Sequence, residues 1–244
     1  MRVTVLGNSG RLLLPLGAGA SYLLEAAGRR VLLDATNGTH FRLAGSRLDA
    51  VVMTHLHLDA FADMLPVLAS LDRPTPFFVP AGAERHIRDI FDRRAMDPKA
   101  IALAEMRPAS AGSEAWVGDL RLRFAKARHG CIAVALRADA DGAALAYLAD
   151  TGARPGLVDL ARGADLVVAH TLLLDREAGK EVATTNMTAG QAGRLAREAG
   201  ARRLALAHVP FYLRREDSLL EAKGHFGGEA FVLEDGRAYD VRAE

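Results

Sequence analysis

The chain has 244 residues, half of them hydrophobic and a quarter charged, which is the balance of an ordinary globular enzyme. Its formal net charge of +1 argues against a protein built around the phosphate backbone of a long nucleic acid. A single cysteine excludes an internal disulfide, the first ten residues do not resemble a secretion signal, and no apolar run is long enough to span a bilayer. We therefore expect a cytoplasmic protein without a membrane partner.

Apolar runs with β-branched residues predict strands in the first half of the chain, at 2–6, 21–26, 30–34, 49–53 and 76–79. Residues 28–30 are typical of the turn of a hairpin between the second and third strands. Helical patterns follow at 59–70 and 82–95.

Further apolar runs predict strands in the second half, at 119–125, 131–137, 143–148, 166–169, 204–207, 229–233 and 237–241. Thr188 is a suitable N-cap for a helix that Gly200 ends, and residues 234–236 are expected to form the turn between the last two strands. No linker divides the chain, so we expect a single domain over 1–244. Strand meanders interrupted by helices predict an α/β protein in which two packed sheets carry helices on their outer faces.

The run from Thr54 to Ala60 carries the strongest chemical signal. His55, His57 and Asp59 alternate directly after a predicted buried strand, so all three side chains can point into one cavity. Imidazole nitrogens and carboxylate oxygens are ligands that Zn²⁺ and similar metals favour.

Four more candidate residues follow in order, each predicted at the end of a strand or in its turn: His129, Asp150, His170 and His208. Strand ends can hold ligands rigidly while leaving one side open to substrate. The order of histidines and aspartates resembles the metallo-β-lactamase superfamily over nearly the whole chain. Within this superfamily, the chain is most similar to the ribonuclease Z-like and phosphodiesterase-like branch. Residues 8–10, Asp34 and residues 188–208 resemble the corresponding segments of that branch.

The resemblance implies an αββα sandwich of two mixed sheets with metals at one edge. It implies one metal site formed by His55, His57, His129 and a bridging Asp150. A second site would use Asp59, Asp150 and His208. The resemblance favours Zn²⁺, with Mn or Fe as alternatives, and a metal-bound hydroxide as the attacking group.

Three positions depart from the family pattern. Ala60 stands where the branch usually has a histidine, so the second metal site is the uncertain one. Thr171 replaces a glutamate after His170, and Asn186 replaces a histidine before the helix that Thr188 begins. His40, expected in a loop, and Asn186 are two candidates to approach the space beside Ala60.

The resemblance and its departures predict roles for individual residues. Asp59 and His170 are the predicted catalytic residues, Asp59 by orienting or deprotonating water. Asn186 and Thr171 are predicted to contact the substrate. His86 and His225 are expected on a helix surface and in a loop, without chemistry. Cys131 lies two residues after His129, so on a strand both side chains could face one side, but we expect a buried structural thiol and not a ligand.

The sequence therefore predicts a metal-dependent hydrolase of a small ester, lactone, thioester or phosphoester. Residues 66–108 contain no basic, glycine-rich insertion of the ribonuclease Z type, which favours a small-molecule substrate. Two alternatives stay open: a biosynthetic enzyme that uses the metal as a Lewis acid without hydrolysis, and a catalytically silent metal-containing binding protein. The sequence is also compatible with a homodimer.

Overall fold

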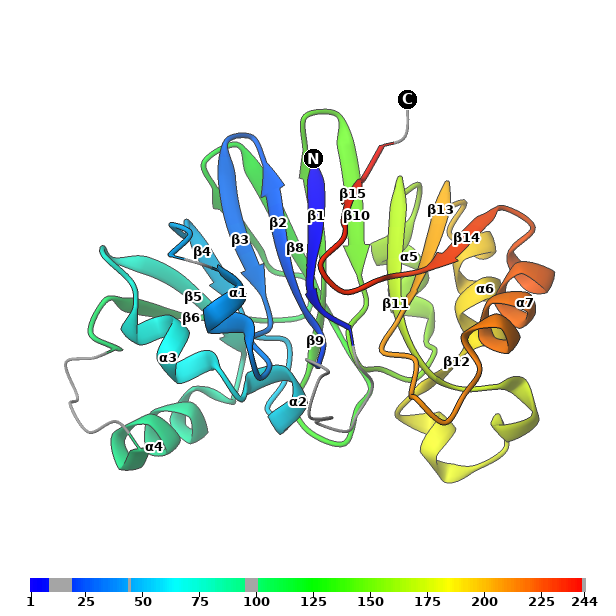
Figure 1. Cartoon of the computed structure of the whole chain (residues 1–244), viewed down its shortest axis with the longest axis horizontal. Coiled ribbons are helices and arrows are strands. Elements are labelled where there is room, and N and C mark those ends of the chain that lie inside the picture. The colour runs from blue at the N-terminus through cyan, green and yellow to red at the C-terminus, as the bar shows by residue number, and fades with distance from the viewer. Residues whose placement is uncertain (9–18, 44, 95–100, 243–244) are drawn as a thin grey trace.

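In the computed structural model, two mixed β-sheets pack face to face and helices cover their outer surfaces (Figure 1). The structure describes residues 1–8, 19–43, 45–94 and 101–242, with the backbone alone for 92–94. The predicted αββα sandwich is confirmed. Residues 9–10 of the family-like N-terminal turn and the last residue of the helix expected at 82–95 lie outside the described residues.

The first sheet has seven strands, in the spatial order β15 (Ala238–Asp240), β1 (Arg2–Gly7), β2 (Ser21–Ala26), β3 (Arg29–Leu33), β4 (Ala50–Val52), β5 (Thr75–Pro80) and β6 (Ala104–Ala109). The strands are antiparallel from β15 to β3 and parallel from β3 to β6. Ala27 and Gly28 close the β2–β3 hairpin with φ of 49° and 67°. Two positive φ values are what a type I′ turn requires, so the predicted hairpin is confirmed.

The second sheet has eight strands, in the order β14 (Glu229–Val232), β13 (Arg203–Ala207), β11 (Leu166–Leu173), β10 (Ala143–Tyr147), β9 (Val134–Ala140), β8 (Leu120–Lys126) and β7 (Glu114–Val117), with β12 (Met187–Thr188) paired to β11. Every residue of β10 and β11 is buried. Near-continuous apolar runs are typical of parallel strands that are covered on both faces.

The first sheet is flanked by α1 (Thr39–Leu43), α2 (Leu58–Phe61), α3 (Met64–Ala69) and α4 (Glu84–Arg94). The second is flanked by α5 (Pro155–Ala161), α6 (Ala189–Glu198) and α7 (Arg215–Phe226), with the 3₁₀ turns η2 (Asp175–Glu177) and η3 (Glu181–Thr184) between β11 and β12. Thr188 and Gln191 form a capping box at the start of α6, which confirms the predicted N-cap. Among the described residues, no helix is long and apolar enough to cross a membrane.

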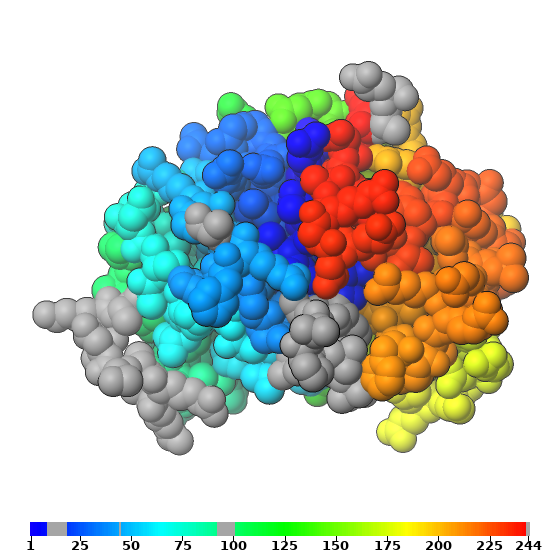
Figure 2. All heavy atoms as spheres, viewed as in Figure 1, coloured from blue at the N-terminus to red at the C-terminus, as the bar shows by residue number. Residues whose placement is uncertain are grey.

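Three apolar layers hold the sandwich together. The layer between the sheets includes Tyr22, Leu136 and Tyr147. Met64 and Ile87 pack from α3 and α4 onto the first sheet, and α5 to α7 pack onto the second in the same way. Strands β1 and β15, near the two ends of the chain, are paired, and Figure 2 shows these N-terminal and C-terminal segments side by side at the surface.

Two of the wrong sequence predictions of secondary structure concern how elements are connected. The helix expected over 59–70 is divided into α2 and α3, because the Asp63 N–H donates to the Ala35 carbonyl outside the helix. The strands expected at 229–233 and 237–241 do not form a hairpin, since β14 pairs with β13 in the second sheet and β15 pairs with β1 in the first. Residues 234–236, expected to be a hairpin turn, therefore lead the chain from the second sheet to the first.

Candidate metal centre

The predicted ligands come from loops of both sheets at one edge of the sandwich. His55, His57 and Asp59 follow β4 of the first sheet, and Asp150 and His208 follow β10 and β13 of the second. His129 lies in the connection between β8 and β9. The backbone N–H of Val134 donates to the Thr54 carbonyl, which joins the two sets of loops directly.

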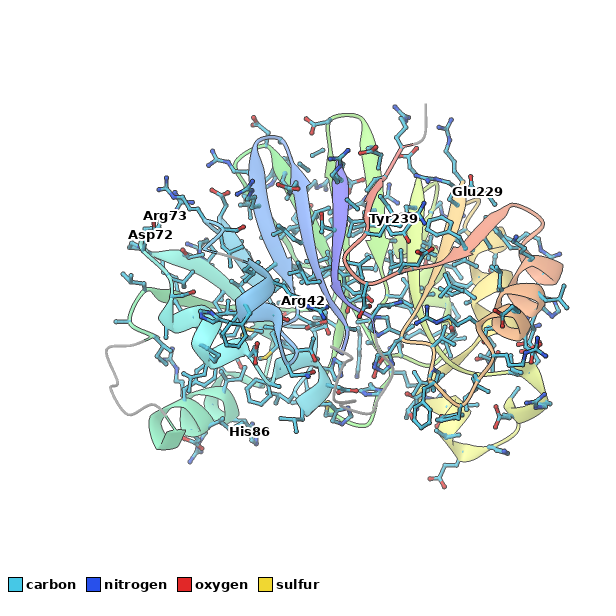
Figure 3. The ribbon with its side chains drawn as sticks, viewed as in Figure 1. Arg42, Asp72, Arg73, His86, Glu229 and Tyr239 are labelled. Atoms are coloured by element: carbon cyan, nitrogen blue, oxygen red, sulfur yellow. The ribbon has the colours of Figure 1, made fainter. Side chains whose placement is uncertain are left out.

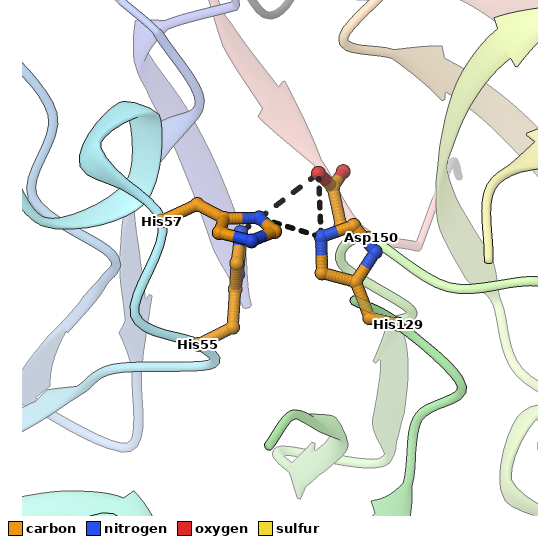
Figure 4. Close-up of side chains that lie close together, drawn as sticks. All are labelled: His55, His57, His129 and Asp150. Atoms are coloured by element: carbon orange, nitrogen blue, oxygen red, sulfur yellow. Dashed lines mark hydrogen bonds and ion pairs between the residues drawn. The ribbon is translucent and has the colours of Figure 1, made fainter. Parts of the chain in front are cut away.

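Four side chains form the first ligand group: His55, His57, His129 and Asp150 (Figure 4). One ligand atom from each lies within 4.8 Å of the others. The Asp150 Oδ2 atom is 3.8 Å from His55 Nε2 and 3.6 Å from His129 Nε2, and His57 Nδ1 is 2.8 Å from His129 Nε2. Three imidazoles and a carboxylate therefore converge on one point.

Neighbouring groups decide which nitrogens face that point. His129 Nδ1 lies 2.9 Å from the Thr185 carbonyl and must donate its hydrogen there, which leaves the Nε2 lone pair towards Asp150. Thr54 Oγ1 donates to Asp34 at 2.8 Å and can accept from His55 Nδ1 at 3.0 Å. Such outer contacts fix the tautomer of metal-binding histidines.

His55 gives the test of whether this group fits an ion. Burial lowers the pKa of His55 to about 3, so its ring is neutral at physiological pH. Its Nε2 atom is buried and has no hydrogen-bond partner among the described residues. Buried polar atoms in native proteins are rarely left in this way, and a divalent cation would satisfy this nitrogen. The residues therefore fit a metal of the kind that imidazole and carboxylate bind.

A second ligand group consists of Asp150, His170 and His208. The Asp150 Oδ1 atom is 2.8 Å from His170 Nδ1 and 3.6 Å from His208 Nδ1. Asp59 Oδ2 lies 3.3 Å from His208 Nε2 on the other side of that ring. The two oxygens of Asp150 thus face different groups, Oδ2 the first and Oδ1 the second, as the bridging role predicted for it requires.

The charge of Asp150 depends on these imidazoles. Burial alone would raise the pKa of this carboxyl, but His208, His170 and His55 lower it well below its usual range. Asp59 behaves similarly: burial opposes ionisation, and His208 lowers the pKa of Asp59 below that of a free aspartate. Both carboxylates are therefore ionised at neutral pH and available as ligands or acceptors.

The sequence predicted His170 at the end of a strand, but it lies inside β11. β11 continues to Leu173 because β12 pairs with it at Thr171 and Leu173. The His170 ring is 2% exposed, and its Nε2 atom is 3.4 Å from the Tyr22 hydroxyl. Tyr22 donates to Asn8 Oδ1, which also accepts the backbone N–H of His208. His170 therefore belongs to a buried network that joins Asp150 to the His208 backbone.

The predicted substrate residues Asn186 and Thr171 are both buried. The Asn186 amide donates to the Val182 carbonyl and to Thr185 Oγ1, beside the carbonyl that holds His129. The Thr171 hydroxyl has no hydrogen-bond partner in the described part of the chain. Their contact with a substrate stays a prediction.

His40 and Asn186, the two candidates to fill the space beside Ala60, contact other residues. Ala60 is 3% exposed in α2. His40 lies in α1 and not in a loop, and it borders a hollow formed with residues 43, 45–48 and 70–72. The Asn186 amide is used within its own loop, as described above. In the second ligand group, His170 is the further imidazole that reaches Asp150 beside His208.

The remaining singled-out residues lie outside both ligand groups. His86 is exposed on α4, as predicted (Figure 3). His225 is in the last turn of α7 and not in a loop, 3.2 Å from Asp175 Oδ2. Cys131 lies in the loop before β9, because that strand begins at Val134 and not at residue 131.

A buried acceptor that the sequence analysis did not assign supports the histidine loop. Asp34 is fully buried directly after β3. Its carboxylate accepts the Thr54 N–H and hydroxyl at 2.7 and 2.8 Å and the Tyr147 hydroxyl at 2.8 Å. The signal was an aspartate that directly follows a buried apolar strand, next to the run that leads to Thr54.

The backbone is strained at three buried positions of the site. Asp34, Ala149 and His208 have φ of 57°, 53° and 57°, in the left-handed region that non-glycine residues rarely adopt. Such positions persist where surrounding contacts over-determine them and are common at functional sites. At His208 the Asn8 side chain holds the backbone N–H at 3.0 Å.

Gly152 holds the histidine and aspartate loops together. Its N–H donates to the Arg128 carbonyl, and the Arg128 N–H donates to Thr151 Oγ1. These two bonds fix His129 relative to Asp150. A Cβ on Gly152 would lie 2.1 Å from the Thr184 carbonyl oxygen, next to the residue that orients His129.

We therefore expect Gly152→Ala to destabilise the fold by roughly 3 kcal/mol and to weaken metal binding, because the 184–185 backbone must move. Urea unfolding and zinc titration would measure both effects. Gly156→Ala is the control, since a Cβ there meets nothing within 4 Å and α5 should gain up to about 1 kcal/mol. Equal behaviour of the two variants would contradict the packing argument.

Comparison with known proteins identifies the family. A model of the β-lactamase superfamily domain matches residues 29–209. The chain belongs to this superfamily. Its two sheets and flanking helices are those of the metallo-β-lactamase hydrolase fold, and its His/Asp groups have the composition of metal-binding sites.

Relatives of this metallo-β-lactamase-fold chain match over nearly its full length. The probable metallo-hydrolase YhfI of Bacillus subtilis is 26% identical over 98% of this chain and 100% of its own. A ribonuclease Z of Haloferax volcanii is 25% identical over 99% of this chain and 95% of its own. The crystal structure of YhfI superimposes with a TM-score of 0.84, and that of zinc-bound PqqB from Methylobacterium extorquens with 0.80, at 24% and 15% identity and each over 98% of this chain. The superposition covers 98% of the YhfI chain and 100% of the PqqB chain.

Proposed function

We propose that this metallo-β-lactamase-fold hydrolase uses zinc to cleave a small ester, lactone, thioester or phosphoester. The observation that carries the proposal is the first ligand group, with three imidazoles and an ionised carboxylate within 4.8 Å of one another. This donor set suits Zn²⁺, and the zinc in PqqB supports the choice over Mn or Fe. A bound ion would make hydroxide available near neutral pH and would stabilise negative charge on an ester oxygen.

Other side chains of the site would position the water and hold the ligands. We assign Asp59 the role of holding a water by accepting its hydrogen at a carboxylate oxygen, because the low pKa of Asp59 keeps it ionised. The sequence predicted His170 as catalytic, but its contact with Asp150 supports a positioning role. We keep Asp59, Asp150 and His208 as a second ligand set, which His170 borders.

The proposal is tested by turnover of chromogenic esters, lactones, thioesters and phosphodiesters by zinc-loaded protein. We expect at least one class to be hydrolysed, and His55→Ala to lower that rate by at least about 100-fold through metal loss. His86→Ala, which removes an exposed histidine of α4, should leave it unchanged. A zinc-loaded, folded wild type that turns over none of the four classes would contradict hydrolysis and favour the Lewis-acid or silent-protein alternative.

A further inference from the structure

A cavity of about 850 Å³ opens beside the first ligand group. His129 and Gly130 belong to its lining, and a Cβ on Gly130 would lie 3.7 Å from His57 Cε1. The volume is in the range of small-molecule sites. A molecule in this cavity would therefore touch the residues that hold the metal.

Three cations from two segments line the cavity, and no acidic side chain does so among the described residues. Lys126 ends β8, Arg128 precedes His129, and Arg154 is the N-cap residue of α5. We call these three residues and the cavity that they line the basic pocket. A cleft that carries one sign of charge concentrates ligands of the opposite sign.

The three cations differ from most surface arginines of this chain. Arg107, Arg121 and Arg162 each pair with a nearby carboxylate, whereas the described residues offer no ion pair to Lys126, Arg128 or Arg154. Arg154 Nη1 donates to the Lys126 carbonyl at 3.3 Å, which anchors its guanidinium at the cavity. The Arg128 backbone is fixed by Thr151 and Gly152, as described above. The Arg154 guanidinium and the Arg128 backbone are thus held in place, and all three cations are available to an external anion.

The rest of the lining is largely apolar. Ala81, Ile132, Val134 and Pro155 contribute to it, and Ile132 is 46% exposed. Apolar walls exclude water and strengthen the attraction between charges beside them. The lining therefore suits an organic group that carries an anion.

We infer that the basic pocket is a subsite for an anionic group, phosphate or carboxylate, on the part of a small substrate that lies away from the bond being cleaved. The inference rests on the proposed function, because it uses the metal centre as the second anchor of the substrate. RNA would also offer anions, but the net charge of +1 and a largely apolar cavity of small-molecule size favour a small molecule.

Three non-hydrolysable probes test the subsite by calorimetry on zinc-loaded protein: phenylphosphonate, benzene-1,4-diphosphonate and 4-phosphonobenzoate. We expect the two probes that carry two anionic groups to bind about tenfold more tightly than phenylphosphonate, since each charge-assisted contact adds to affinity. An equal gain for both indicates a general anion subsite, and a larger gain for the diphosphonate indicates a phosphate subsite. The gain should shrink as salt is added.

The Arg128→Ala/Arg154→Ala double variant should lose the gain, whereas Arg107→Ala/Arg121→Ala should keep it. Equal binding of all three probes by the wild type, or a gain that survives the double variant, would overturn the inference. So would displacement of the diphosphonate by unmodified tRNA, which would place the cations on an RNA-binding face. Failure of the proposed function looks different: the zinc-loaded protein would turn over none of the four substrate classes, whichever probes it binds.

Discussion

Replacing Asp150 by asparagine is expected to remove zinc and turnover together. Each oxygen of this carboxylate faces a different pair of imidazoles, and the side chain is 4% exposed. The amide keeps the size of the side chain but loses its charge and one of the two acceptor oxygens. We expect zinc affinity to fall by at least about 100-fold, measured by competition with a chromogenic chelator.

Asp165→Asn is the matched control for this variant. Asp165 is also buried, at 5% exposure, and accepts the Ala144 N–H at 2.9 Å far from the ligand groups. Its replacement should cost some stability and leave zinc affinity unchanged. An Asp150→Asn protein that keeps wild-type zinc affinity would show that the carboxylate is not a ligand.

The second large effect concerns stability and pH. Burial raises the pKa of Asp34 from 3.8 to about 7, although Thr54 and Tyr147 donate hydrogen bonds that lower it. The folded protein therefore holds a proton that the unfolded chain releases near pH 4. Protonation favours the folded state at low pH, and this contribution is lost as the pH rises from about 4 to about 7. A shift of about three units corresponds to about 4 kcal/mol, as an order of magnitude.

The contribution of Asp34 is isolated by comparison with Asp34→Asn, because other buried groups titrate in both proteins. Urea unfolding of the zinc-free proteins should show the wild type losing about 3 kcal/mol relative to the variant between about pH 4.5 and about pH 8, because the first part of the contribution is already lost by about pH 4.5. A difference that does not change with pH would mean that Asp34 is ionised throughout this range in the folded state.

The sequence was sufficient for most of the site because the signals are local. His55 and His57 follow a buried apolar run, and Asp150 and His208 do the same in the second sheet, so the parallel strand ends that place them could be predicted. The capping box of Thr188 could be predicted for the same reason, since it depends on residues only three apart.

What escaped prediction depends on contacts between distant segments. The place of His170 inside β11 requires β12, a two-residue strand without any periodicity of its own. The role of Asp34 requires Tyr147 from the opposite sheet. The basic pocket joins the end of β8 to the start of α5, and no spacing in the sequence indicates that these cations share a cavity.

The central claim is that His55, His57, His129 and Asp150 hold a divalent ion, and zinc content tests it most directly. Wild type, His129→Ala and the control His86→Ala would each be loaded with zinc, dialysed against metal-free buffer and measured by mass spectrometry. We predict about one or more tightly held zinc ions per chain in the wild type and in the control. His129→Ala should lose nearly all of this zinc. A folded wild type without zinc, or a His129→Ala protein that retains all of it, would contradict the account.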